Sequence, residues 1–153
     1  MNNRYIFRGK RKDNGEWIEG YLVKYNERYY IYYEYADEMC QTGNYLSYKE
    51  VIPETVGQCT GLKDKNGKLI FEGDIVIDKY SRERFGFVGV VIYNTELTQF
   101  KIFNKYQPQY VVNLGSLRDS IRILGNIHDT PNLLKLEHDS LCETKNYKAG
   151  DEE

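Results

Sequence analysis

Cysteine and histidine are the side chains in this 153-residue chain best suited to nucleophilic catalysis. Such a mechanism would bring Cys59 or Cys142 together with His128 or His138, with a carboxylate to orient the imidazole. The spacing of these residues along the chain does not require them to meet. Because Cys59 lies among apolar and glycine residues of an expected strand, we predict that it is a buried, unreactive thiol.

Glu72 and Asp74 form a second combination that deserves a chemical test. Residues i and i+2 of a strand share a face, so two such carboxylates can serve as a general acid and a general base. Asp74 follows Gly73 at the expected entrance to a β-barrel, however, and a carboxylate at such a position commonly accepts hydrogen bonds from nearby backbone amides. We expect that structural role and assign no catalytic residue.

Metal and cofactor binding have little support in the residue pattern. His128 and His138, flanked by Asp129 and Asp139, lack the i, i+4 or short-loop spacing that presents ligands to one ion. The glycines of residues 86–89 are not followed by a helical pattern, so no helix end is available for a phosphate group. We therefore expect no metal, no cofactor and no enzymatic activity.

Composition indicates a folded β protein in a reducing compartment. Apolar residues make up 41% of the chain, and 15 tyrosines favour strands over helices. The net charge is -2, and six acidic residues against two basic ones between 137 and 153 leave the body of the chain mildly basic. Three widely spaced cysteines argue against a disulfide framework. Without an apolar run long enough for a signal peptide or membrane span, we expect a cytoplasmic protein with no membrane contact.

Two Asn-Gly pairs predict β-hairpins. Asn14-Gly15 lies between expected strands over residues 4–12 and 16–24, and its preference for positive φ predicts a type I′ turn. Apolar side chains on both faces of the second strand predict that it is covered on both sides. Asn66-Gly67 is followed by a similar pattern, so residues 14–23 align with 66–76. Either common turn chemistry or an internal duplication explains this similarity.

Further strands are predicted along the rest of the chain. Residues 28–35 carry aromatics on both faces, follow the turn-like Asn26-Glu27 and precede a polar loop over 37–44. Short strands then recur at the spacing of a small barrel or sandwich, over residues 75–79, 86–93, 99–103, 110–114 and 121–127. The nearly all-apolar segment 86–93 is expected to be the most buried strand. Asp129-Thr130-Pro131 predicts the start of a short helix.

The chain resembles the YopX family of phage and prophage proteins, from residue 4 to about residue 136. The resemblance rests on Phe7-Arg8-Gly9-Lys10 with Trp17 and Gly20-Tyr21, on residues 53–76, and on Ile123-Leu124-Gly125-Asn126-Ile127 with Pro131, Leu133 and Leu134. It implies an all-β protein with an SH3-type barrel and a phage or prophage origin in a bacterial host. It supplies no catalytic residue, and Cys59 stands where the family motif usually has an aromatic residue.

We therefore predict an all-β fold: an SH3-type barrel preceded by an N-terminal β-hairpin subdomain, with a short C-terminal helix. The hairpin subdomain is expected over residues 1–57. The SH3-like barrel is expected over 58–136, with its capping helix starting at about 131. Residues 137–153 are expected to form an acidic, mobile tail.

The predicted function is that of a non-catalytic interaction module that binds a protein partner or itself; self-binding would produce a homo-oligomer. Tyr30, Tyr32 and Tyr35 are the candidate partner-binding residues, since tyrosine is enriched at interfaces and an unpaired strand over 28–35 could pair with its copy. The alternative is nucleic-acid binding by the SH3-like barrel. Its candidate residues are Lys10, Arg11, Lys12, Arg82 and Arg84, and exposed tyrosines could stack on bases.

Overall fold

The computed structural model describes residues 3–36, 44–78, 87–106, 108, 111–117 and 120–135. These residues form an all-β fold whose helical elements are short 3-10 turns. The strands are β1 (Phe7–Lys10), β2 (Trp17–Tyr25), β3 (Arg28–Ala36), β4 (Asn44–Val51), β5 (Gly57–Lys63), β6 (Leu69–Phe71), β7 (Asp74–Asp78), β8 (Phe87–Asn94), β9 (Gln99–Phe103), β10 (Val111–Asn113) and β11 (Ile121–Asn126). The 3-10 turns are η1 (Asn3–Tyr5), η2 (Pro53–Thr55), η3 (Leu114–Ser116) and η4 (Pro131–Lys135).

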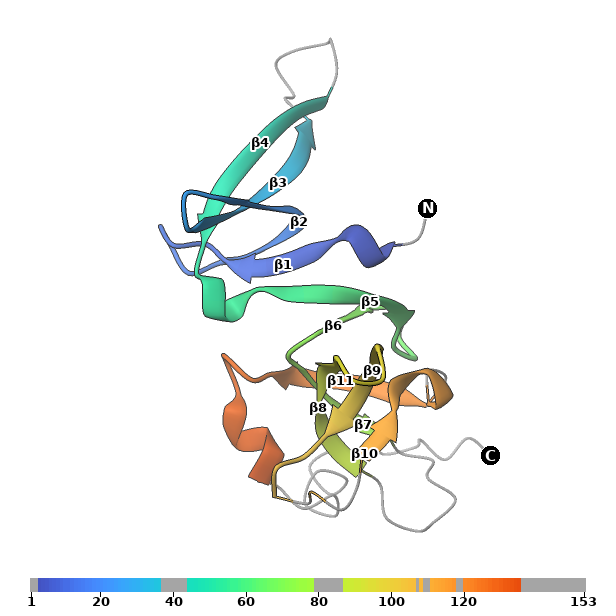
Figure 1. Cartoon of the computed structure of the whole chain (residues 1–153). Helices are drawn as coiled ribbons and strands as arrows, with labels where there is room; N and C mark the ends of the chain where they lie inside the picture. Colours follow the sequence, from blue (N-terminus) through green and yellow to red (C-terminus); the bar gives the residue numbers. More distant parts are fainter. Residues whose placement is uncertain are drawn as a thin grey trace, which may run out of the picture.

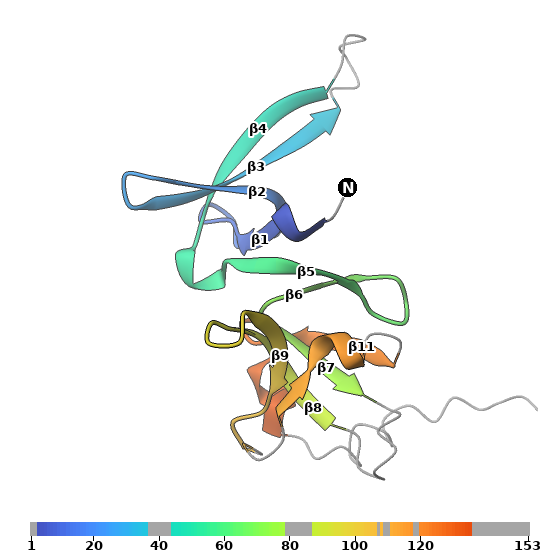
Figure 2. The same cartoon turned by 45° about the vertical axis from the view of Figure 1, so that its right-hand side comes forward.

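The strands are arranged in two antiparallel sheets. The first has six strands in the order β4-β3-β2-β1-β5-β6, and the second has five in the order β10-β9-β8-β7-β11. In both views the β3–β4 hairpin extends away from the five-stranded sheet, and β5 and β6 lie between the two parts (Figures 1 and 2). The predicted boundary after residue 57 therefore lies within the first sheet, because β5 pairs with β1. The SH3-type barrel remains a prediction.

The six-stranded sheet curls so that the end of β4 returns to β1. Arg11 and Val51 form an isolated bridge, the backbone NH of Lys12 donates to the carbonyl of Glu50, and that of Ile52 donates to the carbonyl of Lys10. The inner face of the curl buries Ile31 and Val51. Position 20 of β2, beside this core, requires glycine, because a Cβ there would lie 2.1 Å from the carbonyl oxygen of Tyr32.

The five-stranded sheet contains most of the hydrophobic core. On one of its faces, aliphatic and aromatic side chains from β7, β8, β9 and β11 pack with residues of η3 and β6. On the other face, Leu134 of η4 packs against Ile75, Ile77 and Val88. The predicted helix therefore begins at Pro131 as expected, but it is a single 3-10 segment. None of the helices in the described part of the chain has the length and apolar character needed to span a bilayer.

Both Asn-Gly pairs lie in chain reversals, but the predicted turn type is wrong. Gly15 and Gly67 have positive φ angles of 75° and 81°, whereas a type I′ turn also requires a positive φ at the preceding residue. Each Asn-Gly pair instead lies within a longer loop, the first between β1 and β2 and the second between β5 and β6. The turn with two positive φ angles is Asn26-Glu27, between β2 and β3, with 46° and 59°.

Three further expectations need correction. The most buried strand is β7, all five residues of which are buried, and β8 has exposed or half-buried residues toward its end. The strand after Asn14-Gly15 is not covered on both sides, since Tyr21 and Val23 are exposed. Residues 28–35 are not an unpaired edge, because β3 lies between β2 and β4. β4 is the edge strand next to β3, and no strand was predicted there from the sequence.

Candidate functional site

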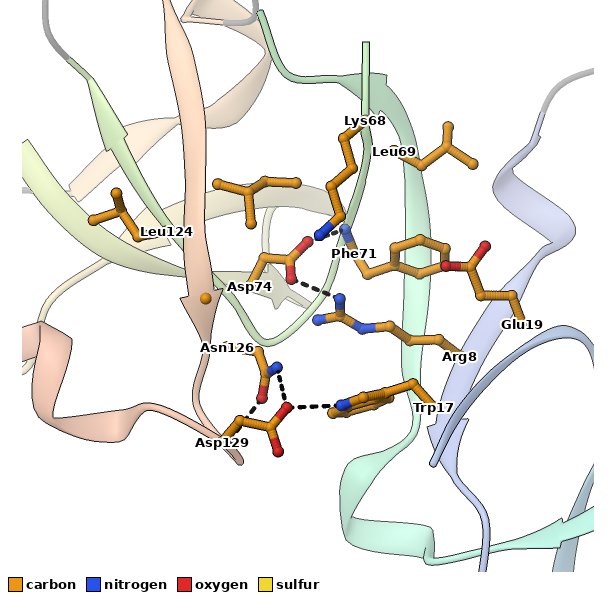
Figure 3. A pocket seen from close by; sticks show the side chains of 12 residues that line it. Arg8, Trp17, Glu19, Lys68, Leu69, Phe71, Asp74, Leu124, Asn126 and Asp129 are labelled. Atoms are coloured by element: carbon orange, nitrogen blue, oxygen red, sulfur yellow. Dashed lines mark hydrogen bonds and ion pairs between the residues drawn. The ribbon is translucent and has the colours of Figure 1, made fainter. Parts of the chain in front are cut away.

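Arg8 of β1 occupies the junction between the two sheets. Its side chain is almost fully buried, and its Nη1 lies 2.6 Å from Oδ1 of Asp74 at the start of β7. Its Nη2 donates to the backbone carbonyl of Glu72 at 3.2 Å. The guanidinium carbon lies 5.0 Å from the ring centroids of both Trp17 and Phe71, which places the cation over two aromatic rings. Figure 3 shows Arg8 reaching from the first sheet toward Asp74.

Asp74 is held by backbone as well as by Arg8. Its Oδ2 accepts a hydrogen bond from the backbone NH of Phe71 at 2.8 Å, and the residue is 1% exposed. Gly73, with a φ of 83°, makes the turn that places the carboxylate next to this amide. Burial raises the pKa of Asp74, and the charge of Arg8 opposes that effect. The expected bonding of this carboxylate to a nearby amide is confirmed.

A second carboxylate, Asp129, joins the segment after β11 to the first sheet. Its Oδ2 accepts hydrogen bonds of 2.7 Å from Nε1 of Trp17 and from Nδ2 of Asn126, and its Oδ1 forms an ion pair with Lys10. Lys10, Asn126 and Trp17, in that order, hold the pKa of Asp129 well below its usual range. His128 lies against the Trp17 ring at 5.9 Å, and burial followed by the nearby positive charges lowers its pKa.

A pocket of about 430 Å³ lies between β1, β2, β6 and β11, and the residues that line it include Arg8, Trp17, Phe71, Asp74, Asn126 and Asp129 (Figure 3). Most of the charged side chains that line it already have a partner, because Arg8 pairs with Asp74 and Asp129 pairs with Lys10. The charged lining groups without a hydrogen bond or ion pair to a described residue are Glu19 and Lys68, both exposed. The side chains around the pocket therefore serve mainly to join the two sheets. The described charged groups among them do not converge on a reacting centre.

The residues considered for catalysis lie in separate environments. Cys59 of β5 is fully buried, and burial raises the pKa of its thiol, which is the opposite of what activates a nucleophile. Glu72 accepts a hydrogen bond from the backbone NH of Tyr93, whereas Asp74 is bonded to Arg8. Among the described residues, no group of three acidic, cysteine or histidine side chains could hold a metal ion. Cys142 and His138 lie outside the described residues.

The tyrosine-rich strands present a continuous exposed face. The register pairs Tyr21 with Tyr32 and Tyr32 with Tyr48, and alternation along each strand adds further residues to the same side. We call this side the tyrosine surface; its members are Tyr21, Val23 and Tyr25 of β2, Tyr30 and Tyr32 of β3, and Leu46 and Tyr48 of β4. Tyr25 is 66% exposed, Leu46 63% and Tyr48 56%.

The structure brings two of the three predicted partner-binding residues together. Tyr48 stacks on Tyr32 with 5.1 Å between ring centroids and meets Tyr30 edge-on at 5.8 Å. Tyr35 lies on the opposite side of β3, where its ring is 6.1 Å from that of Tyr45. Sequence reasoning missed the contributions of β2 and β4. Alternation along residues 21–25 was the available signal for β2, whereas the mixed polar and apolar residues of β4 gave none.

The described residues of the predicted nucleic-acid site are paired with acidic side chains. Arg11 bonds to Asp13 and Glu16, and Lys12 Nζ lies 2.7 Å from Oε1 of Glu50. Lys10 is paired with Asp129 at the junction, so the three basic residues do not form one open positive patch. Arg82 and Arg84 lie outside the described residues.

Comparison with known proteins identifies the family. Among solved structures, the crystal structure of protein EF1440 from Enterococcus faecalis has a similar fold, with a TM-score of 0.50 and 23% sequence identity, and the match covers 84% of this chain and 96% of that chain. No curated protein matches the chain. The profile described as YopX protein matches residues 6–135, which is most of the sequence. This chain therefore belongs to the YopX family.

Proposed function

We propose that this protein is a non-catalytic interaction module that binds another protein chain through the tyrosine surface. The observation that carries the proposal is a set of exposed large apolar and aromatic side chains on one side of β2 and β4, with the half-buried Tyr30 and Tyr32 of β3 between them. Soluble proteins rarely leave a large contiguous apolar patch open to water unless it is used for binding. Tyrosine is also among the residues most enriched in the energetically dominant parts of protein interfaces.

Three rings of this surface already pack against one another in the single chain. Tyr48 packs against both Tyr30 and Tyr32, and all three lie on hydrogen-bonded strands. Side chains that are pre-organised in this way lose less conformational freedom when a partner binds. Their hydroxyl groups add hydrogen bonds at the rim of a contact whose body is apolar. The surface is therefore suited to a protein partner.

Electrostatics favour a protein over a nucleic acid. Nucleic-acid binding depends on free lysine and arginine side chains that neutralise phosphates. Lys10, Arg11 and Lys12 are each engaged by a carboxylate. Arg28, on the same side of the sheet as Tyr30 and Tyr48, lies 3.9 Å from Glu50, which also pairs with Lys12. The described basic residues beside the tyrosine surface are therefore engaged by a carboxylate as well.

The environments of the candidate catalytic groups support the non-catalytic part of the proposal. The thiol of Cys59 is buried with a raised pKa, and the carboxylate of Asp74 is committed to Arg8 and a backbone amide. A working nucleophile or general base needs an accessible position and a pKa near the operating pH. Both groups instead have the surroundings of structural side chains.

A variant pair on β2 tests the proposal. Tyr21→Ser combined with Tyr25→Ser removes two exposed rings, and Tyr5→Ser combined with Tyr106→Ser removes two exposed rings that lie outside the tyrosine surface. Each immobilised protein is exposed to a lysate of the bacterium that carries the gene, and bound proteins are quantified by mass spectrometry. We expect the first pair to lose bound proteins at least tenfold relative to wild type, and the second pair to retain them.

The same comparison separates protein binding from nucleic-acid binding. Wild-type protein is also applied to heparin and to mixed-sequence RNA and DNA at low salt. Two results together would contradict the proposal and favour the nucleic-acid alternative. Wild-type protein would be retained on these columns with a retention that falls steeply as salt rises, and both variant pairs would capture equal amounts of protein. Wild-type protein that passes through these columns while Tyr21→Ser/Tyr25→Ser abolishes capture supports it.

A further inference from the structure

The free edge of β4 leads to an inference that goes beyond the tyrosine surface itself. We propose that two copies of this chain pair through β4, antiparallel, about a twofold axis at Leu46. The pairing joins two six-stranded sheets into one continuous sheet and places the two tyrosine surfaces side by side. The occupant of the edge is therefore a second copy of the same chain.

The register with β3 identifies which backbone groups of β4 face outward. On the side away from β3, the carbonyl of Glu50 accepts from the backbone NH of Lys12, just after β1, and the NH of Ile52 donates to the carbonyl of Lys10, the last residue of β1. In an antiparallel strand, alternate residues direct both their NH and their carbonyl to the same side. Asn44, Leu46 and Tyr48 therefore direct theirs outward too, whereas the odd-numbered residues bond to β3. Among the described residues, no backbone group pairs with these three outward positions.

The bond between Glu50 and Lys12 limits how far a second strand can extend along this edge. Beyond Tyr48 the outward side is occupied by the end of β1 and the two residues after it, so the open positions are Asn44, Leu46 and Tyr48. One twofold arrangement uses all three: Leu46 opposite Leu46 of the other copy, and Asn44 opposite Tyr48. Shifting the centre toward Tyr48 would push the strand of one copy against β1 of the other. The register is thus set by the fold.

The residues of this window suit pairing with their own copies. Residues 44–48 carry no charge, so a twofold arrangement places no like charges opposite each other, whereas the flanking Lys49 and Glu50 are charged. Leu46 is 63% exposed in the single chain and would pack against the same side chain of the other copy. Within residues 44–48 the edge carries no proline and no charged side chain, which are features that usually protect an edge strand against edge-to-edge association.

Disulfide cross-linking at the axis tests both the dimer and its register. Cys40→Ser and Cys142→Ser provide the background, and the buried Cys59 is retained. Opposing Cα atoms in a hydrogen-bonded antiparallel pair are about 5.5 Å apart, which suits a disulfide. We expect Leu46→Cys to give more than half of the protein as a covalent species of twice the 18.1 kDa chain mass under mild oxidation.

Tyr48→Cys in the same background is the matched control. In the proposed register each residue 48 lies opposite residue 44 of the other copy, so two residues at position 48 are about 14 Å apart, beyond the reach of a disulfide. We expect at least tenfold less cross-linked product than from Leu46→Cys. Equal cross-linking by Tyr48→Cys, or none by a folded Leu46→Cys variant, overturns the proposal.

Solution mass gives a second, cysteine-free test. A five-residue strand pair is smaller than a standard interface of roughly 1,200–2,000 Å², so we expect association above about 10 µM. Wild-type mass should rise with concentration in sedimentation equilibrium. Leu46→Pro removes one outward-facing NH and leaves the bonds to β3, and it should remain monomeric. A wild-type monomer at all concentrations up to about 500 µM overturns the inference.

The outcomes distinguish this inference from the proposed function. Tyr21 and Tyr25 lie on β2, away from the edge, so Tyr21→Ser/Tyr25→Ser should still form the Leu46 cross-link. If the chain is monomeric but still captures a protein through Tyr21 and Tyr25, only the proposed pairing of two copies through β4 is contradicted. If the dimer cross-links but its capture of other proteins does not depend on Tyr21 and Tyr25, only the proposed function is contradicted.

Discussion

Removing Arg8 is expected to destabilise the protein far more than removing any exposed basic residue. Arg8→Met leaves the carboxylate of Asp74, 1% exposed, without its 2.6 Å partner. Stranding one member of a buried ion pair typically costs about 3–5 kcal/mol. In a domain of this size, each kcal/mol lowers Tm by roughly 2–4 °C. We therefore expect Tm to fall by about 10 °C, because the lost group also binds the Glu72 carbonyl and lies over two rings.

Urea unfolding followed by far-UV circular dichroism and by Trp17 fluorescence measures this loss. Trp17 is the single tryptophan in the chain, and its ring lies over Arg8, so its emission reports directly on the junction. Arg11→Met is the matched control. Arg11 pairs with Asp13 and Glu16 on the surface, where solvent screens the ion pair and leaves it little effect on stability.

A double-mutant cycle separates the ion pair from general packing. If the two side chains stabilise each other, Arg8→Met combined with Asp74→Asn should cost about 1.5–3 kcal/mol less than the sum of the two single changes. Additive losses would mean that the two charges do not interact. A loss for Arg8→Met no greater than that for Arg11→Met would refute the assignment of Arg8 as the link between the sheets.

Three further predictions concern backbone space, the buried thiol and the second carboxylate. In urea unfolding, Gly20→Ala should lower the free energy of unfolding by at least about 2 kcal/mol more than Gly15→Ala does. A Cβ at position 20 would collide with a β3 carbonyl, whereas position 15 has open space and only an unfavourable positive φ. With the other two cysteines replaced, Cys59 should react with a disulfide reagent at pH 7 at least 100-fold more slowly in the folded protein than in urea, and equal rates would contradict its burial and raised pKa. Because the pKa of Asp129 is lowered, its bonds stabilise the fold above the ordinary value of 3.8 and are lost as pH falls through the lower folded value. Trp17 emission should therefore show no transition at or above 3.8 that depends on Asp129. A transition centred there in the wild-type protein and absent from Asp129→Asn would contradict this, whereas Asp74, with its raised pKa, would give a transition in both proteins.

The hairpins and most strands could be predicted because their signals are local. Glycine after asparagine marks a reversal wherever the chain needs a positive φ, and both Asn-Gly pairs do lie between paired strands. The detailed turn type could not be predicted in the same way, because it depends on how many residues on each side join the ladder. At Asn14-Gly15 the ladder ends at Lys10 and Trp17, which leaves a longer loop.

The junction between the sheets could not be predicted, since its residues are far apart in the chain. Trp17 and Asp129 are separated by 112 positions, and no periodicity relates them. The tyrosine surface was only partly predictable for a related reason. Alternation places Tyr30 and Tyr32 on one side of a strand and Tyr35 on the other, but pairing with β4 adds Tyr48 and Leu46 and turns β3 from an edge into an interior strand.

A photo-crosslinking amino acid in place of Tyr25 tests most directly whether the tyrosine surface is where this protein meets another chain. The account predicts a covalent adduct with a protein from position 25, competed by excess wild-type protein but not by Tyr21→Ser/Tyr25→Ser. It predicts no such adduct from position 106, an exposed tyrosine that follows β9 of the five-stranded sheet. An absence of protein adducts from position 25, or equal adducts from both positions, would contradict it.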